Sequence, residues 1–246
     1  MATSNERNGA FRTLAAIIVP PWTAMVKYEF RGKENLPAKG AAVLSPNHMS
    51  EADPITVAVA VWRLGRAPRF MAKAGLWKVP VLRWALQSSG QVPVERSGST
   101  RAADPMKAAR QIVDSESLVI IYPEGSLTRD PDLWPMRGKS GAVRMALQAG
   151  IPLIPIAQWG TQNLLPRYSK RIRPFPRKKI IVSIGEPLDL SKYQGKELTG
   201  ALLKEATEEL MTAITALLAE IRGEQAPEKR WNPSEHKQNE TGRFDG

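Results

Sequence analysis

A strand–loop–helix stretch decides the fold: residues 41–64, with the sequence AAVLSPNHMSEADPITVAVAVWRL. The apolar run Ala41–Leu44 predicts a buried strand, and the apolar pattern of Pro54–Leu64 predicts a helix. The loop between them is polar and contains His48 and Asp53. Because ligands collect at the loops that follow the strands of α/β sheets, this loop is the first candidate for a functional site.

The same alternation of strands and helices continues along most of the chain. Strands are predicted at Tyr28–Arg31, Ala41–Leu44, Arg69–Met71, Gln91–Val94, Leu118–Tyr122, Leu153–Ala157 and Lys179–Ile184. Helices are predicted at Pro54–Leu64, Val79–Gln87, Thr100–Asp114, Gly138–Ala149 and, as one long C-terminal helix, Lys196–Arg222. This order indicates an α/β domain in which a mostly parallel central sheet is flanked by helices.

The N-terminal segment has an amphipathic pattern. One helical face is apolar: Phe11, Leu14, Ala15 and Ile18. We expect Pro20-Pro21 to end that helix, and the apolar stretch Trp22–Val26 to form a second one. Such an N-terminal amphipathic helix pair would either lie in a membrane surface or pack on the domain core. The predicted organisation is membrane-surface helices over 1–27, a folded domain over 28–222 and a flexible polar tail over 223–246.

The composition excludes several classes of protein. The 246 residues are 42% hydrophobic and 24% charged, which is typical of a folded chain with one large or two small domains. The absence of cysteine rules out disulfides, thiolate metal sites and a cysteine nucleophile. The two histidines are His48 and His236, so a multi-histidine metal centre is excluded. Because His236 falls in the polar tail, any histidine chemistry in the folded part belongs to His48.

The chain is strongly basic, with a formal net charge of +11. This charge favours anionic partners such as nucleic acid, anionic lipid headgroups or phosphorylated substrates, but no nucleic-acid-binding motif accompanies it. One run without acidic residues, 166–180, contains Arg167, Lys170, Arg171, Arg173, Arg177, Lys178 and Lys179. It is either a solvated basic face or a docking site for anionic lipid headgroups or the phosphates of CoA.

Two uncharged runs are candidates for membrane spans. The first, 13–26, is too short and is interrupted by prolines, and the second, 145–166, contains glycines, prolines and side-chain amides. Neither predicts a transmembrane helix, and the N-terminus lacks the features of a secretory signal. We therefore expect a protein of the cytosol or of the cytosolic face of a membrane.

His48 and Asp53 form a candidate catalytic pair. On one continuous helix their five-residue spacing would separate them by about 140°, so they meet only if His48 lies in the loop and Asp53 at the helix entry. Asp53 is a typical N-cap, and Pro54 a typical first helical residue. A hydrogen bond from one imidazole nitrogen to this carboxylate would make the other nitrogen a base for an alcohol proton. The alternative is that Asp53 is only a cap.

Three further blocks follow in the sequence. They are Gly90–Arg96 (GQVPVER), Tyr122–Ser126 (YPEGS) and Ile151–Ala157 (IPLIPIA). With Asn47-His48 and Asp53, these blocks resemble those of the glycerolipid acyltransferase family, and within it the 1-acylglycerol-3-phosphate acyltransferases. That family has Asn-His-x-x-x-x-Asp, an arginine after a short strand, Pro-Glu-Gly and a proline-rich apolar strand. The segment Phe30–Pro37 is also similar to the family's, and the resemblance covers about residues 25–190.

The resemblance implies roles for individual residues. His48 would be the general base on the acceptor hydroxyl, oriented by Asp53. The expected substrate-binding residues are Asn47, Arg96, Glu124, Gly125, Ser126, Arg129 and Lys139, with Arg96 on the acceptor's phosphate. Pro155 and its neighbours would line the acyl or CoA region. Without the resemblance, Arg96 is a surface arginine, Glu124 a turn residue and Pro155 part of a plain buried strand.

One block departs from the family pattern. Members often continue Pro-Glu-Gly-Thr-Arg-Ser, whereas here Glu124-Gly125 is followed by Ser126-Leu127-Thr128-Arg129. Arg129 either reaches the acceptor's phosphate from two positions later, or that contact is lost. The segment Arg137–Gly141 (RGKSG) precedes a predicted helix and could supplement it, because free backbone N–H groups and Lys139 suit an anion.

The predicted protein is an O-acyltransferase on the cytoplasmic face of the cell membrane, bound there as a peripheral (monotopic) protein. It would transfer a fatty acyl group from acyl-CoA, or from acyl carrier protein, to the sn-2 hydroxyl of 1-acylglycerol 3-phosphate (lysophosphatidic acid). The product would be phosphatidic acid, and neither a metal nor a cofactor is implied beyond acyl-CoA as co-substrate. A same-family enzyme acting on glycerol 3-phosphate or a glycolipid is the alternative. A non-catalytic basic module that binds membranes or nucleic acid is less favoured.

Overall fold

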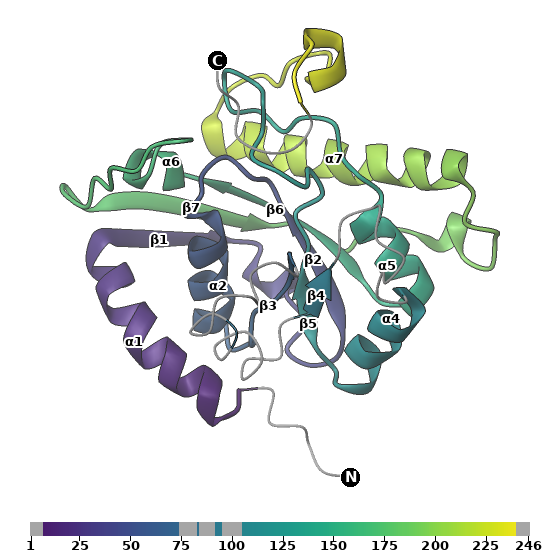
Figure 1. The fold of residues 1–246 in the computed structure, drawn as a ribbon, viewed down its shortest axis with the longest axis horizontal. Helices are drawn as coiled ribbons and strands as arrows, with labels where there is room; N and C mark the ends of the chain where they lie inside the picture. The colour runs from purple at the N-terminus through teal and green to yellow at the C-terminus, as the bar shows by residue number, and fades with distance from the viewer. Residues whose placement is uncertain (1–6, 74–82, 84–91, 95–104, 240–246) are drawn as a thin grey trace.

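The computed structural model describes residues 7–73, 83, 92–94 and 105–239. Its strands are β1 (Val26–Arg31), β2 (Ala42–Pro46), β3 (Arg69–Lys73), β4 (Val92–Val94), β5 (Leu118–Ile120), β6 (Leu153–Trp159) and β7 (Lys178–Ile184). Within the described residues they form one seven-stranded sheet in the order β1-β7-β6-β2-β5-β3-β4 (Figure 1). Neighbouring strands are parallel except for β6 and β7. The prediction of a mostly parallel sheet is confirmed.

Helices cover both faces of this sheet. They are α1 (Gly9–Met25), α2 (Asp53–Arg63), α4 (Pro105–Asp114), α5 (Gly141–Ala149), α6 (Thr161–Leu164) and α7 (Gly200–Arg222). Short 3-10 turns occur at Lys33–Asn35, Ser191–Tyr193 and Pro233–His236. The long C-terminal helix is confirmed as α7. Apart from residue 83, the predicted helix Val79–Gln87 lies outside the described residues, as does the start of the one predicted from Thr100.

Strand β2 shows why both faces are apolar. Leu44 packs in a buried cluster with side chains of α1 and α2. Val43, one position earlier, packs instead in a cluster with side chains of α4, α5 and α7. Successive side chains of a strand point to opposite faces, so a strand covered on both sides needs a continuous apolar run. In Figure 1, α1 and α2 accordingly lie on one side of the sheet and α7 on the other.

The N-terminal helix pair is a wrong prediction. The segment is a single helix, α1, and it runs through Pro20 and Pro21. These prolines remove the hydrogen bonds that would reach the carbonyls of Ala16 and Ile17. Because Ala16, Ile17 and both prolines are exposed, water can hydrate those carbonyls, and the helix continues.

The flexible polar tail predicted from residue 223 is also wrong for its described part. Within 223–239 many residues are exposed, but several contact the domain, and Pro233 is buried. The carbonyl of Trp231 accepts a hydrogen bond from the N–H of Arg137 at 2.9 Å, and Arg230 forms an ion pair with Glu208 of α7. The polar composition of this segment does not predict these contacts, because the partner residues lie far away in the sequence.

Among the described residues, no helix combines the length and the apolar character needed to cross a bilayer.

Candidate active site

The candidate site lies in the loop between β2 and α2. His48 donates from Nδ1 to Oδ2 of Asp53 over 2.9 Å. The same oxygen accepts the backbone N–H groups of Met49 at 2.6 Å and Ser50 at 2.8 Å. Asp53 is fully buried, whereas the side chain of His48 is 16% exposed. The structure therefore brings the two side chains together, with the carboxylate inside and the imidazole at the surface.

Asp53 reaches this position as the first residue of α2, not as its N-cap. The N-cap is Ala52, and Asp53 directs its carboxylate back to the preceding loop. The cap prediction is wrong in this detail. Two N–H groups of the loop therefore hold the carboxylate in place, and the carboxylate in turn orients His48.

This arrangement fixes the chemistry of the imidazole ring. With Nδ1 donating to a carboxylate, Nε2 carries the lone pair and can accept a proton. The ring also stacks on Tyr122, with 4.2 Å between ring centroids and an angle of 29° between the planes. Burial raises the pKa of the Tyr122 hydroxyl well above its ordinary value, and the nearby charge of Asp53 adds to the effect. Tyr122 is thus a neutral support for His48, and its place just before Pro-Glu-Gly was the only sequence signal.

Glu124 ties the loop of His48 to a second segment. It is fully buried, and its Oε1 accepts the backbone N–H of His48 at 2.8 Å. Its Oε2 accepts the backbone N–H of Met136 at 3.0 Å. Burial raises the pKa of Glu124 to about 8, although both backbone hydrogen bonds act in the opposite direction. The N–H of Thr128 also donates to the carbonyl of His48 at 2.7 Å, so this residue is held from two sides.

Asn47 anchors the same loop to the neighbouring strand. Its Oδ1 accepts the backbone N–H of Gln158 in β6 at 2.8 Å, and its Nδ2 donates to the carbonyl of the same residue at 3.2 Å. Asn47 is buried. Both polar atoms of its amide are therefore engaged in holding the loop, and its predicted contact with substrate stays a prediction.

The Pro-Glu-Gly turn brings Lys139 near this region. Gly125 has a φ of 70°, and a Cβ there would be 3.2 Å from Cδ of Lys139, so the lysine stem lies over the glycine. The N–H of Lys139 donates to the carbonyl of Pro123 at 2.7 Å. Ser126 follows the turn, partly exposed, and its hydroxyl lies 3.4 Å from the carbonyl of Leu127. The structure thus places these predicted residues side by side, while their contacts with substrate stay predictions.

Arg129 points to a different neighbourhood. Its guanidinium is buried and donates to the hydroxyl of Tyr168 and, at 3.2 Å, to the carbonyl of Asn239. The structure thus gives Arg129 a structural contact with the 166–180 segment and the C-terminal segment. Arg96 lies outside the described residues. Pro155 is buried in β6, where its carbonyl accepts the N–H of Gly185 at 2.9 Å, and its link to the acyl chain or CoA stays a prediction.

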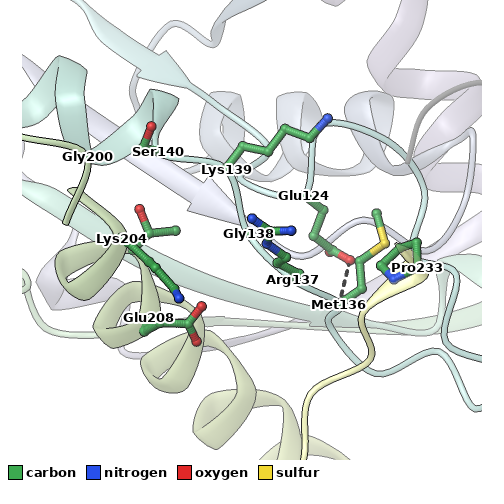
Figure 2. Close-up of a pocket in the computed structure, with 11 residues that line it drawn as sticks. Glu124, Met136, Arg137, Gly138, Lys139, Ser140, Gly200, Lys204, Glu208 and Pro233 are labelled. Atoms are coloured by element: carbon green, nitrogen blue, oxygen red, sulfur yellow. Dashed lines mark hydrogen bonds between the residues drawn. The ribbon is translucent and has the colours of Figure 1, made fainter. Parts of the chain in front are cut away.

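A cavity of about 430 Å³ opens beside Glu124 (Figure 2). The loop before α5 and the first turns of α7 line it, with Arg137, Lys139 and Lys204 as its cations. Within the described part of the chain, no group of three or more His, Asp and Glu side chains is placed to hold a metal ion.

Comparison with known proteins identifies the family. The family model described as "Acyltransferase" matches residues 27–159, which is more than half of the chain and includes all four sequence blocks. The chain belongs to the acyltransferase family. This confirms the resemblance inferred from the blocks, and the match ends at the last residue of β6.

Two relatives of this chain are informative. A chloroplastic 1-acyl-sn-glycerol-3-phosphate acyltransferase of Brassica napus is 31% identical over 157 residues, which are 63% of this chain and 44% of the relative. The enzyme of the same name from Borreliella burgdorferi is 24% identical over 201 residues, which are 80% of this chain and 77% of the relative. The chain thus spans less than half the length of the plant relative.

A solved structure supports the fold of this chain. The crystal structure of the 1-acyl-sn-glycerophosphate (LPA) acyltransferase PlsC of Thermotoga maritima superposes with a TM-score of 0.61 at 22% identity. The superposition covers 88% of this chain and 81% of the other. The two chains share the α/β architecture described above.

Proposed function

We propose that this chain transfers a fatty acyl group from a thioester donor, acyl-CoA or acyl carrier protein, to the sn-2 hydroxyl of 1-acylglycerol 3-phosphate. The product is phosphatidic acid. The observation that carries this proposal is the His48–Asp53 hydrogen bond of 2.9 Å, which leaves Nε2 of a partly exposed imidazole as the base. The choice of acceptor is supported by the names of relatives from a plant, a spirochaete and Haemophilus influenzae.

The proposed reaction needs no covalent acyl-enzyme. Nε2 of His48 takes the proton of the acceptor hydroxyl while the hydroxyl oxygen attacks the thioester carbonyl carbon. An oxygen–carbon bond forms, and the carbon–sulfur bond then breaks. The leaving thiolate takes up the proton from His48, so the imidazole returns to its starting state. A thioester is already activated, and for this reason one positioned base is sufficient.

The surrounding residues act on the position of His48. Asp53 holds the ring by Nδ1 and stabilises the imidazolium that forms when Nε2 is protonated. Glu124 and Thr128 hold the backbone of His48 from its N–H and its carbonyl. Preorganisation of this kind keeps Nε2 in one position, so that the acceptor hydroxyl meets the base in the geometry that proton transfer requires.

The test is acceptor-dependent release of thiol from palmitoyl-CoA with 1-acylglycerol 3-phosphate. Wild type, His48→Ala and Asp53→Asn are compared, and His236→Ala is the matched control because His236 stacks on Trp231 and belongs to the C-terminal 3-10 turn, not to the loop of His48. We expect His48→Ala to lower kcat by at least about 100-fold, the usual contribution of a general base. The control should equal wild type. Equal rates for His48→Ala and wild type would overturn the mechanism.

Competition among acceptors tests the substrate. Glycerol 3-phosphate and a glycolipid are offered together with 1-acylglycerol 3-phosphate, and the acylated products are separated. Preferred acylation of 1-acylglycerol 3-phosphate is the expected result. Preference for another acceptor would keep the reaction class and replace the substrate.

We also propose that the protein works as a peripheral protein on the cytoplasmic face of the cell membrane. Both lipids of the proposed reaction reside in a bilayer. In support, the basic segment 166–180 carries two exposed apolar side chains, Ile172 at 53% and Phe175 at 75%. Basic residues attract anionic headgroups, and exposed apolar side chains beside them can enter the interface.

A further inference from the structure

The cavity beside Glu124 has two facing walls. One is the loop that leads into α5, with Arg137 and Ser140, and the other is the start of α7, with Lys204 and Glu208. In Figure 2, the side chain of Lys204 runs along α7 and ends beside Glu208, while Arg137 comes from the loop on the other side of the cavity. Lys139 lies at the edge, directed away from Lys204. Arg137 and Lys204, which are 67 positions apart in the sequence, therefore line the same cavity.

The carboxylates of this cavity do not cancel its positive charge. Glu208 is already in an ion pair with Arg230. Glu124 is buried and accepts two backbone N–H groups, and burial raises its pKa to about 8, which weakens its negative charge near neutral pH. Within the described part of the chain, Lys204 forms no ion pair. Three cationic side chains, Arg137, Lys139 and Lys204, thus line the cavity together with two carboxylates, one of which is paired with Arg230.

These donors suit a phosphate group. A guanidinium gives phosphate a planar fork of N–H donors, and an ammonium adds a compact charge. The hydroxyl of Ser140 lies in the same wall, where α5 begins without a side-chain cap. The volume of about 430 Å³ falls in the range of cavities that take small molecules rather than single ions. The expected ligand is therefore a phosphate carried on a larger molecule.

The cavity is coupled directly to the candidate active site. Met136 lines the cavity, and its N–H shares the carboxylate of Glu124 with the N–H of His48. The side chain of Glu124 thus connects the backbone of His48 to the wall of the cavity. Both substrates of the proposed reaction carry phosphate, the acceptor as a monoester and CoA on its nucleotide.

We propose that the cavity between Arg137 and Lys204 is a phosphate subsite that anchors one substrate of the acyl transfer beside His48. This inference rests on the proposed function for the identity of the substrate. The acyl donor and the acceptor both carry a phosphate group. The experiment must therefore show which of the two substrates the cavity binds.

The test measures binding without turnover. Isothermal titration of the full chain uses two probes: adenosine 3′,5′-bisphosphate, which carries the nucleotide phosphates of CoA, and glycerol 3-phosphate. The variants are Arg137→Gln and Lys204→Gln. Lys204→Arg keeps the charge, and Lys196→Gln is the matched control because Lys196 is exposed and does not line the cavity.

We expect Arg137→Gln and Lys204→Gln each to raise Kd at least about tenfold for one probe, while Lys204→Arg and Lys196→Gln stay near wild type. Loss for the bisphosphate assigns the subsite to the donor, and loss for glycerol 3-phosphate assigns it to the acceptor. Kd values unchanged for both probes, or no binding of either by wild type, would overturn the subsite. A wild type that binds a probe through these residues yet shows no acyl transfer would refute the proposed function alone.

Discussion

Among the single residues, Glu124 joins more of the molecule than its sequence context suggests. The turn chemistry of Pro-Glu-Gly predicts a strand end, and the family resemblance predicts a substrate contact. The structure adds a bridge, in which the carboxylate accepts N–H groups from His48 and from Met136. His48 is 76 positions away, and no local pattern reports which distant backbone group a buried side chain meets. The pair His48–Asp53 was predictable because both residues lie in one short segment, five positions apart.

The burial of Glu124 predicts a pH dependence of stability. Its pKa is raised from its ordinary 4.5 to about 8, so between these values the folded chain keeps a proton that the unfolded chain has released. The free energy of unfolding must therefore fall as the pH rises through this window, by up to about 1.4 kcal/mol per pH unit from this residue. Urea unfolding of wild type and Glu124→Gln from pH 5 to 8.5 measures it. The variant should gain stability relative to wild type as the pH rises, and parallel curves would contradict the prediction.

Among the elements, those with local signals were predictable and those shaped by distant contacts were not. β2, β6 and α7 have apolar patterns that match their burial on both faces or on one. The continuation of α1 through Pro20-Pro21 depends on which side of the helix faces solvent, which the sequence does not state. In the same way, the C-terminal segment looked like a tail because its contacts lie on other elements.

The turn after β6 is an element whose geometry requires glycine. Gly160 has a φ of 115°, and a Cβ there would be 2.1 Å from the carbonyl oxygen of Lys179 in β7. The chain then passes through α6 to Leu165, whose carbonyl accepts the hydroxyl of Ser50 at 2.6 Å. Gly160 thus permits the close approach of β7, and the segment that follows it supports the loop of His48.

We expect Gly160→Ala to destabilise the fold by more than the same substitution at a matched glycine, Gly150. Gly150 also has a positive φ, 62°, but has open space around it, so Gly150→Ala should cost only about 1–2 kcal/mol of backbone strain. Gly160→Ala should cost about 1–3 kcal/mol more, because the backbone of β7 must move. Urea unfolding of both variants gives the difference. Equal losses would show that β7 yields freely to the added methyl group.

At the scale of the whole molecule, hydrogen bonds join the basic segment 166–180 to the end of α1. Arg177 donates from Nε to the carbonyl of Val26 at 2.9 Å and from Nη2 to that of Thr23 at 2.6 Å. These bonds fasten the end of the 166–180 segment to the end of α1, and both elements lie towards the left of Figure 1. Ile17 of α1 is 65% exposed, and we propose that it belongs with the basic segment to one membrane-docking face.

This face predicts how the protein partitions onto vesicles. Anionic phosphatidylglycerol vesicles should bind the chain, neutral phosphatidylcholine vesicles should bind it less, and added salt should release it, because exposed basic residues each contribute about 1 kcal/mol near an anionic surface. Replacing Ile172 and Phe175 with serine removes the apolar part, and at about 1.5–3 kcal/mol for each fully buried side chain the partition coefficient should fall at least about tenfold. The matched control is Val113→Ser, since Val113 is also exposed but belongs to α4. Cosedimentation measures all three proteins. If the double variant and the control bind equally, the docking face lies elsewhere, and the charge of +11 acts without these side chains.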